Sequence, residues 1–121
     1  MDLDKVLSAD WRTKSGRQFV LDVLAKIKPI SKYAADDGQV PLVKIERLVW
    51  TVVERYEVDV VWIFVSHDDA GMRYTASVRS KQPGVTYKIV YGITLYEVMA
   101  KVAITMWDLI KRKIIKQKKV D

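Results

Sequence analysis

The chain has 121 residues, of which 50% are hydrophobic and 30% are charged, and its formal net charge is +6. This length suits one folded domain, and the hydrophobic content excludes the composition of a disordered chain. Because the sequence contains no cysteine, a disulfide framework, a thiolate metal site and a cysteine nucleophile are excluded as well.

Two helices are predicted in the first half of the chain. Apolar residues recur at helical spacing over 14–28, where Thr13 or Ser15 can cap the start and a proline ends the pattern. The loop-forming stretch SKYAADDGQVP follows. A wide apolar stripe then predicts a second helix over 41–56, with Pro41 at its first position.

Three antiparallel strands are predicted next. Residues 58–66 are rich in β-branched and aromatic residues and apolar on both faces, as in a well-covered strand. Residues 72–80 and 85–91 alternate between apolar and polar positions, which is typical of strands with one solvent-exposed face. The sequences HDDAG and KQPG form the two turns. The strands therefore form a meander joined by two hairpins.

The polar face of these strands carries several basic residues. Arg73, Thr75, Ser77 and Arg79 share one face of the middle strand, because side chains alternate with a period of two. We expect Lys88 of the third strand beside them, together with Thr86, on a cationic, hydroxyl-bearing surface. An ordinary solvated sheet face would show the same pattern.

A long helix is predicted after the sheet. Thr94 and Glu97 form a capping-box pattern, and apolar residues then recur at helical spacing to about residue 116. Such a helix measures roughly 33 Å, longer than a strand of eight residues, so we expect its basic end to overhang the sheet. Of the aromatic residues, Trp62 and Trp107 fall at core positions, and Trp50 falls at the edge of the core.

The order of these elements predicts an α+β fold with two N-terminal helices, a three-stranded antiparallel meander and a C-terminal helix. We expect a single domain over 1–121, made of a helix and loop over 1–40, a core over 41–116 and a basic tail over 117–121. The second and last helices would cover the apolar face of the sheet. The first helix would close an edge of the sheet or cover the far side of the first strand. A second copy of the chain is the other candidate for covering that side.

The amino terminus and the hydrophobic runs indicate where in the cell the protein is located. The opening MDLDKVLSADWRTK lacks the basic start and the apolar stretch of a secretory signal. The longest strictly apolar run, residues 60–65, is far shorter than the roughly 20 residues of a membrane-spanning helix. We therefore expect a cytoplasmic protein without a membrane span.

Enzymatic constellations are missing from the sequence. His67, Asp68 and Asp69 lie together, but their string is typical of a hairpin turn, whereas metal ligands usually come from spaced positions. The element order resembles that of restriction-endonuclease-like proteins, yet residues 72–92 contain no Asp or Glu to hold the catalytic metal. Neither a catalytic triad nor a glycine-rich phosphate loop is present. We expect a protein that is not an enzyme, with no metal, cofactor or small-molecule substrate.

One family shares part of this layout. From Pro41 to about Leu109, the order helix, three strands, helix resembles a double-stranded-RNA-binding domain, with His67 in the first hairpin loop and the pair Ala100 and Lys101 in the last helix. The resemblance implies binding by shape, through phosphate and 2′-hydroxyl contacts. The family's lysine pair near the start of that helix is replaced here by Tyr96 and Glu97. The last helix would therefore not dock as in that family, and the resemblance is one of layout.

The distribution of charge provides the functional hypothesis. Residues 1–71 carry ten Lys and Arg against twelve Asp and Glu, whereas residues 72–121 carry eleven against three. Such an asymmetric positive field favours encounters with polyanions. We expect a small accessory protein that binds nucleic acid through its phosphate backbone. The candidate residues are Arg73, Arg79, Lys81, Lys88, Lys111, Arg112, Lys113, Lys116, Lys118 and Lys119.

Two alternatives remain open. Cations in the last turns of a helix are favoured by the helix dipole, so a lysine-rich helix end requires no ligand. The apolar first strand and the wide stripe on the last helix instead favour a protein-interaction module, either a homodimeric regulator or a protein that binds an acidic partner.

Overall fold

The computed structural model of the protein describes residues 1–36, 38–68, 71–81 and 88–119, without the side chains of residues 63–68, 71 and 72. Its helices and strands confirm the predicted α+β fold with a three-stranded antiparallel sheet. The elements in chain order are α1 (Leu3–Ser8), α2 (Lys14–Ala25), α3 (Lys28–Ser31), α4 (Leu42–Arg55), β1 (Val58–Asp68), β2 (Gly71–Ser80), β3 (Lys88–Gly92) and α5 (Leu95–Lys111).

The sheet is a meander in the order β1-β2-β3, as predicted. In its register Val61 lies opposite Ser77, which lies opposite Ile89 of the third strand. The first turn is shorter than predicted, because His67 pairs with Met72 and both His67 and Asp68 belong to β1. The remaining turn residues, Asp69 and Ala70, and the predicted strand residues 85–87 lie outside the described residues.

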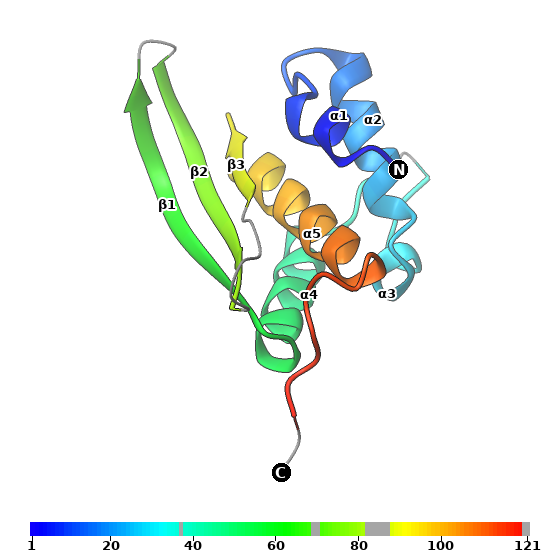
Figure 1. Ribbon diagram of the computed structural model, residues 1–121. Helices are drawn as coiled ribbons and strands as arrows, with labels where there is room; N and C mark the ends of the chain where they lie inside the picture. Colours follow the sequence, from blue (N-terminus) through cyan, green and yellow to red (C-terminus); the bar gives the residue numbers. More distant parts are fainter. Residues whose placement is uncertain (37, 69–70, 82–87, 120–121) are drawn as a thin grey trace.

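The helices form two layers on one face of the sheet (Figure 1). Helices α4 and α5 lie against the sheet, and α1, α2 and α3 lie on the far side of α5. Helix α5 is therefore the centre of the fold, and every residue from Glu97 to Met106 is buried. A helix whose surroundings are protein on all sides must be largely apolar, as this one is.

The position of the first long helix differs from the prediction. We expected it to close an edge of the sheet or cover the far side of the first strand, but α2 packs on α5. The physical reason is that α5 is largely apolar around its circumference. Without α2, the side of α5 that faces away from the sheet would be exposed to water. Consequently, no helix of the described residues lies over the outer face of the sheet (Figure 1).

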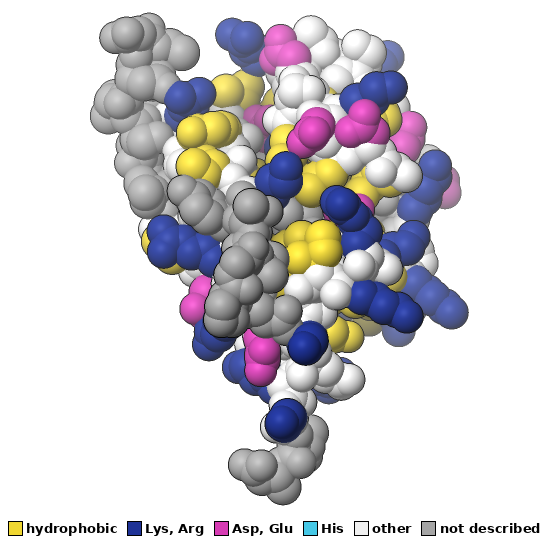
Figure 2. All heavy atoms as spheres, in the orientation of Figure 1, with side chains coloured by type: hydrophobic (Ala, Val, Ile, Leu, Met, Phe, Trp, Pro, Cys, Tyr) yellow, Lys and Arg dark blue, Asp and Glu magenta, His cyan; other side chains and the backbone are white. Residues whose placement is uncertain are grey.

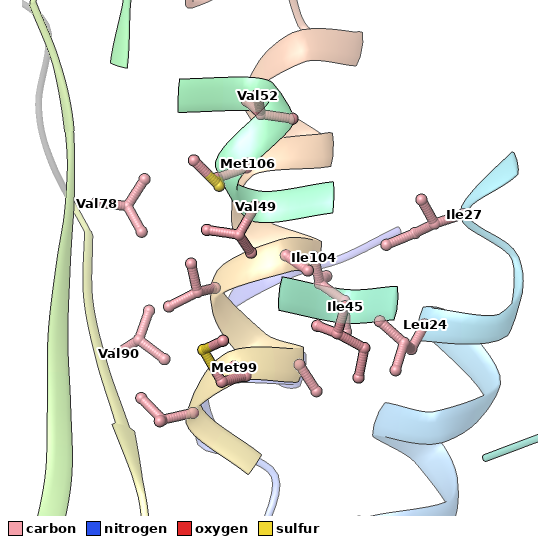
Figure 3. Close-up of a cluster of buried hydrophobic side chains, with 14 of the residues drawn as sticks. Leu24, Ile27, Ile45, Val49, Val52, Val78, Val90, Met99, Ile104 and Met106 are labelled. Carbon is pink, nitrogen blue, oxygen red and sulfur yellow. The ribbon is translucent and has the colours of Figure 1, made fainter. Parts of the chain in front are cut away.

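The hydrophobic core lies on both sides of α5 (Figure 3). On one side, Val90 points from the sheet toward Met99, and Val78 points toward α5 near Met106. On the other, Ile104 lies near Leu24 of α2. Trp62 and Trp107 are half-buried against this core, as predicted, whereas Trp50 is 48% exposed on α4.

Side-chain caps begin two of the helices, as predicted. The Thr13 hydroxyl accepts a hydrogen bond from the Gly16 N–H at 3.0 Å, and the Thr94 hydroxyl accepts one from the Glu97 N–H at 3.1 Å. Pro41 is the residue before α4 and not its first helical residue. The predicted helix over 14–28 is divided, because α2 ends at Ala25 and the short helix α3 follows.

The last helix ends earlier than predicted, at Lys111, and its basic end does not overhang the sheet as a helix. Lys113 adopts the left-handed conformation with φ 57°. Its N–H donates to the Ile110 carbonyl at 3.0 Å, and the Ile114 N–H donates to the Leu109 carbonyl at 2.9 Å. These two bonds define a Schellman motif, which turns the chain out of the helix.

The turn lets the tail return to the sheet. Ile115 is 4% exposed and joins the core, and Gln117 forms an antiparallel bridge with Tyr56 between α4 and β1. Burial of an isoleucine side chain stabilises the fold by about 1.5–3 kcal/mol, which offsets the helical hydrogen bonds that the chain gives up. The helical spacing in the sequence did not predict this return.

Among the described residues, no helix is both long and apolar enough to cross a membrane.

Candidate nucleic-acid interface

The outer face of the sheet carries the polar residues that the sequence predicted for it. Arg73, Thr75, Ser77 and Arg79 alternate along β2 with Ala76 and Val78, which are both fully buried on the inner face. The cations at the two ends of this row are six residues apart, or about 20 Å along an extended strand. Phosphates follow one another within that reach along a nucleic acid.

The same face also exposes hydrophobic side chains. Val61 of β1 is 40% exposed, and Ile89 and Tyr91 of β3 are 43% and 42% exposed. The guanidinium of Arg73 lies 4.2 Å from the centre of the Tyr91 ring, a cation–π contact. This contact holds a cation and an aromatic ring together at the upper end of the sheet, near the start of α5.

The tail brings further cations to the lower end of this face. The Glu57 N–H donates to the Lys116 carbonyl at 2.8 Å, and the Glu57 carbonyl accepts from the Lys81 N–H at 3.0 Å. On the other side of the bridge, the Lys118 N–H donates to the Arg55 carbonyl at 2.8 Å. The tail therefore forms an isolated antiparallel bridge next to the start of β1, outside the three strands of the sheet.

Because paired residues share a face of a pleated sheet, this pairing decides where the lysines lie. Glu57 is two residues from Asp59, which is opposite Arg79, so its cross-strand neighbours Lys81 and Lys116 share the outer face. We call Arg73, Arg79, Lys81, Lys116 and Lys118 the outer basic face. Lys119 follows them and is exposed.

Two described acidic residues, Glu57 and Asp59, lie among the cations of this face. The Lys81 ammonium lies 3.5 Å from the Asp59 carboxylate, with both side chains about half exposed. Glu57 lies between Lys81 and Lys116 in the pairing. An exposed ion pair of this kind contributes about 0–1 kcal/mol, so a phosphate can compete for its lysine.

Lys88 lies on the other face of the sheet, contrary to the prediction. It is opposite Val78, whose side chain is buried, and its ammonium lies 3.5 Å from the Asp4 carboxylate. Ile89 and Tyr91 take the outer positions instead. The predicted neighbour Thr86 lies outside the described residues.

Lys111, Arg112 and Lys113 are also separate from the outer basic face. Lys111 and Arg112 line a groove between α5 and the first two helices, and Arg112 lies 3.4 Å from Asp108. Lys113 forms the turn after α5. The structure therefore unites only part of the predicted set of basic residues on one surface.

A buried ion pair that the sequence did not predict lies behind the upper end of the sheet. The Lys101 ammonium is 2.6 Å from the Glu97 carboxylate and donates to the carbonyls of Leu7 and Ala9 at 3.3 and 2.9 Å. The second carboxylate oxygen of Glu97 accepts from the Ile93 N–H at 2.7 Å. The side chains of Lys101 and Glu97 are only 2% and 5% exposed.

This ion pair borders a pocket of about 310 Å³, whose wall also includes Asp10 and Arg12. Hydrogen bonds from the side chain and the backbone of Arg12 lower the pKa of the Asp10 carboxyl, and the same pair raises the pKa of Arg12. With three acceptors already around it, the Lys101 ammonium has no N–H for a substrate. The pair therefore connects the α1–α2 loop to α5 and offers no catalytic group.

Comparisons with protein-family models, curated proteins and solved structures found no significant match to this chain. The element order from α4 to α5 is the one in which the sequence resembles double-stranded-RNA-binding domains. The residues that carried the resemblance are placed differently. His67 belongs to β1, and the buried Lys101 does not reach the surface where a phosphate would bind.

Proposed function

We propose that the protein is a non-enzymatic accessory protein that binds nucleic acid through the outer basic face. The observation that carries this proposal is the pairing of Glu57 with Lys116 on one side and with Lys81 on the other. It makes the basic tail and the end of β2 one surface, so that cations from distant parts of the sequence can contact successive phosphates of one strand.

The character of the face supports phosphate contacts more than base recognition. Its cations and the hydroxyls of Thr75 and Ser77 suit phosphate oxygens, which position a nucleic acid without reading its sequence. Tyr91, with Arg73 over its ring, adds one exposed aromatic ring for contact with a sugar or base. A cytoplasmic location, suggested by the cysteine-free composition, would give the protein access to RNA and DNA.

The test compares two variants of equal charge. In Lys116→Glu/Lys119→Glu the reversals lie in the tail, and in Lys26→Glu/Lys111→Glu they lie beside the groove on the other side of α5. All four residues are exposed. Each reversal removes two units of charge, so both variants fall from +6 to +2. A difference between them therefore reports the location of binding.

The measurement is fluorescence anisotropy of labelled duplex RNA, duplex DNA and single-stranded DNA at about 50 and about 200 mM salt. We expect log affinity to fall linearly with log salt, by about 0.9 for each duplex phosphate neutralised. The tail variant should lose most binding and reduce the slope by about two, whereas the groove variant should lose far less. An equal loss of affinity in the tail and groove variants would refute the proposal, and so would the absence of binding by the unmodified protein at low salt.

A second candidate function is a homodimer formed through the same face. It is favoured by the exposure of Val61, Ile89 and Tyr91 on a sheet face that no described helix covers. Burial of three such side chains against a second copy would remove apolar surface from water. Sedimentation equilibrium tests this function, since a strict monomer at high protein concentration excludes it.

A further inference from the structure

A groove of about 770 Å³ lies between α1, α2 and α5, on the side of α5 that faces away from the sheet. Its floor is hydrophobic and comes from two helices. The floor residues are Phe19, Val23 and Ile27 of α2 with its following turn, and Ile104 and Trp107 of α5. Binding sites in proteins are typically concave and mostly apolar, with volumes of about 300–1,000 Å³.

Basic residues surround this floor. Lys5 comes from α1, Lys26 from the end of α2, and Lys111 and Arg112 from the end of α5. Figure 2 shows hydrophobic side chains interspersed with Lys and Arg on the face of the molecule that carries these helices. The combination of an apolar floor and a cationic rim distinguishes the groove from an ordinary gap between helices.

The two carboxylates of the lining are already engaged within the protein. Asp2 caps α1 by accepting from the N–H groups of Asp4 and Lys5, at 3.0 and 3.4 Å. Asp108 is 7% exposed and pairs with Arg112. Over residues 1–36, 38–68, 71–81 and 88–119, no carboxylate forms an ion pair with Lys5, Lys26 or Lys111. The rim is therefore positively charged toward anything that enters the groove.

The dimensions of the groove limit the shape of its occupant. Its lining residues extend from Phe19 to Ile27 on one side and from Ile104 to Arg112 on the other, eight residues apart in each case. Eight residues of helix measure about 12 Å, or just over two turns. Apolar side chains at positions i, i+4 and i+7 of an incoming helix cover about the same length, roughly 10 Å.

We propose that this groove binds an acidic amphipathic helix of a partner protein. Two turns of apolar side chains would contact the floor, and carboxylates on both flanks of the incoming helix would lie near Lys5, Lys26 and Lys111. Charge complementarity favours this occupant over a basic or neutral helix. The hydrophobic floor favours it over nucleic acid, whose phosphates would leave Phe19 and Trp107 without an apolar partner.

The site is independent of the proposed nucleic-acid function. The groove and the outer basic face lie on opposite sides of α5, because α1 and α2 pack on the side away from the sheet. One protein could therefore hold a polyanion on the sheet and an acidic helix in the groove. It would act as an adaptor between a nucleic acid and a partner protein.

The test uses a labelled synthetic peptide of about 14 residues, with Leu at i, i+4 and i+7 and Glu on the flanks. Its binding to the full chain is measured by anisotropy. A scrambled peptide of the same composition removes the helical spacing of the leucines. The variants are Phe19→Ala, which truncates a side chain that is already 39% exposed, and the groove variant Lys26→Glu/Lys111→Glu. The tail variant Lys116→Glu/Lys119→Glu is the matched control.

We expect saturable binding of the peptide that weakens with salt and is lost with the scrambled peptide. Phe19→Ala and the groove variant should each weaken it by about tenfold or more, and the tail variant should not. Equal binding of the two peptides, equal loss in both charge variants, or no binding of the peptide would overturn the inference. The groove variant is the control in the nucleic-acid assay, and the tail variant is the control in the peptide assay. Failure of one proposal can therefore be distinguished from failure of the other.

Discussion

Replacement of Lys101 by methionine is expected to destabilise the protein strongly. Methionine preserves most of the length and apolar character of the side chain but removes the ammonium. The Glu97 carboxylate, 5% exposed and 2.6 Å from that ammonium, would then be buried without its counter-charge. The carbonyls of Leu7 and Ala9 would lose their hydrogen-bond donor at the same time.

The magnitude follows from this geometry. Removal of one partner of a buried ion pair costs about 3–5 kcal/mol, because it leaves an uncompensated charge in a medium of low polarity. Replacement of Glu97 by glutamine is also expected to cost about 3–5 kcal/mol, because it leaves the buried Lys101 ammonium without its counter-charge, although an amide oxygen can still accept from the Ile93 N–H. The double variant should cost less than the two single changes together, by about 0.5–3 kcal/mol.

Urea denaturation followed by circular dichroism measures these differences for the four proteins of the cycle. The ion pair is shielded from solvent, so about 1 M salt should change its contribution little, in contrast to the exposed pairs. A loss below about 1 kcal/mol for Lys101→Met, within the range of surface ion pairs, would refute the reasoning. It would mean that the lysine is not held as a buried donor to three acceptors.

Three further predictions test local features of the fold. Since the folded-state pKa of Asp10 is lowered, the stabilisation from its hydrogen bonds is present above the unfolded pKa of about 3.9 and is lost as pH falls through the folded pKa. The NMR titration midpoint of Asp10 should rise toward that value in Arg12→Ala, and an unchanged midpoint would contradict the assignment. Lys113→Gly should stabilise the protein by about 1 kcal/mol, because a side chain is strained at φ 57°, whereas Arg112→Gly, at φ −84°, should not raise the melting temperature. Gly16→Ala should lower stability by about 1–3 kcal/mol in the same melts, because the added Cβ would clash with the Asp10 carbonyl oxygen, and a neutral effect would show that this loop adapts.

The sequence predicted most of the secondary structure, because helical and strand periodicities are local properties of the chain. The prediction of which β3 residues face outward was wrong, because alternation within one strand does not determine which of its faces is buried. Register with β2 directs Val90 inward and Ile89 outward, although both are apolar. Gly92 carried a signal that we did not use: a Cβ there would lie 2.9 Å from the Val98 nitrogen, so only a glycine permits this contact with α5.

The tail shows how tertiary burial overrides helical periodicity. Ile114 and Ile115 continue the helical spacing of α5, yet the chain leaves the helix at Lys113 and buries Ile115 elsewhere. The bridge from Gln117 to Tyr56 joins residues that are far apart in the sequence. No local pattern predicts such a pairing, and the union of tail and strand in the outer basic face depends on it.

Tertiary burial also determined where the first long helix, α2, lies. Its own pattern predicted an amphipathic helix correctly, but not the surface that it would cover. The deciding feature was the composition of α5, whose buried residues are mostly apolar. The exceptions are bonded within the protein: Glu97 pairs with Lys101, Thr105 donates to the Lys101 carbonyl, and Asp108 pairs with Arg112. A helix of that kind requires protein on both sides, so α2 covers α5 and the outer face of the sheet stays open.

The central claim is that nucleic acid binds on the outer face of the sheet and the tail. An NMR titration of the ¹⁵N-labelled protein with a short RNA or DNA duplex at low salt tests it most directly. We predict that amide shifts change along β2 and in the tail, at Arg73, Arg79, Lys81, Lys116 and Lys118, and that residues of the groove between α1, α2 and α5 stay unaffected. Shift changes confined to the groove, or the absence of any change, would contradict the claim.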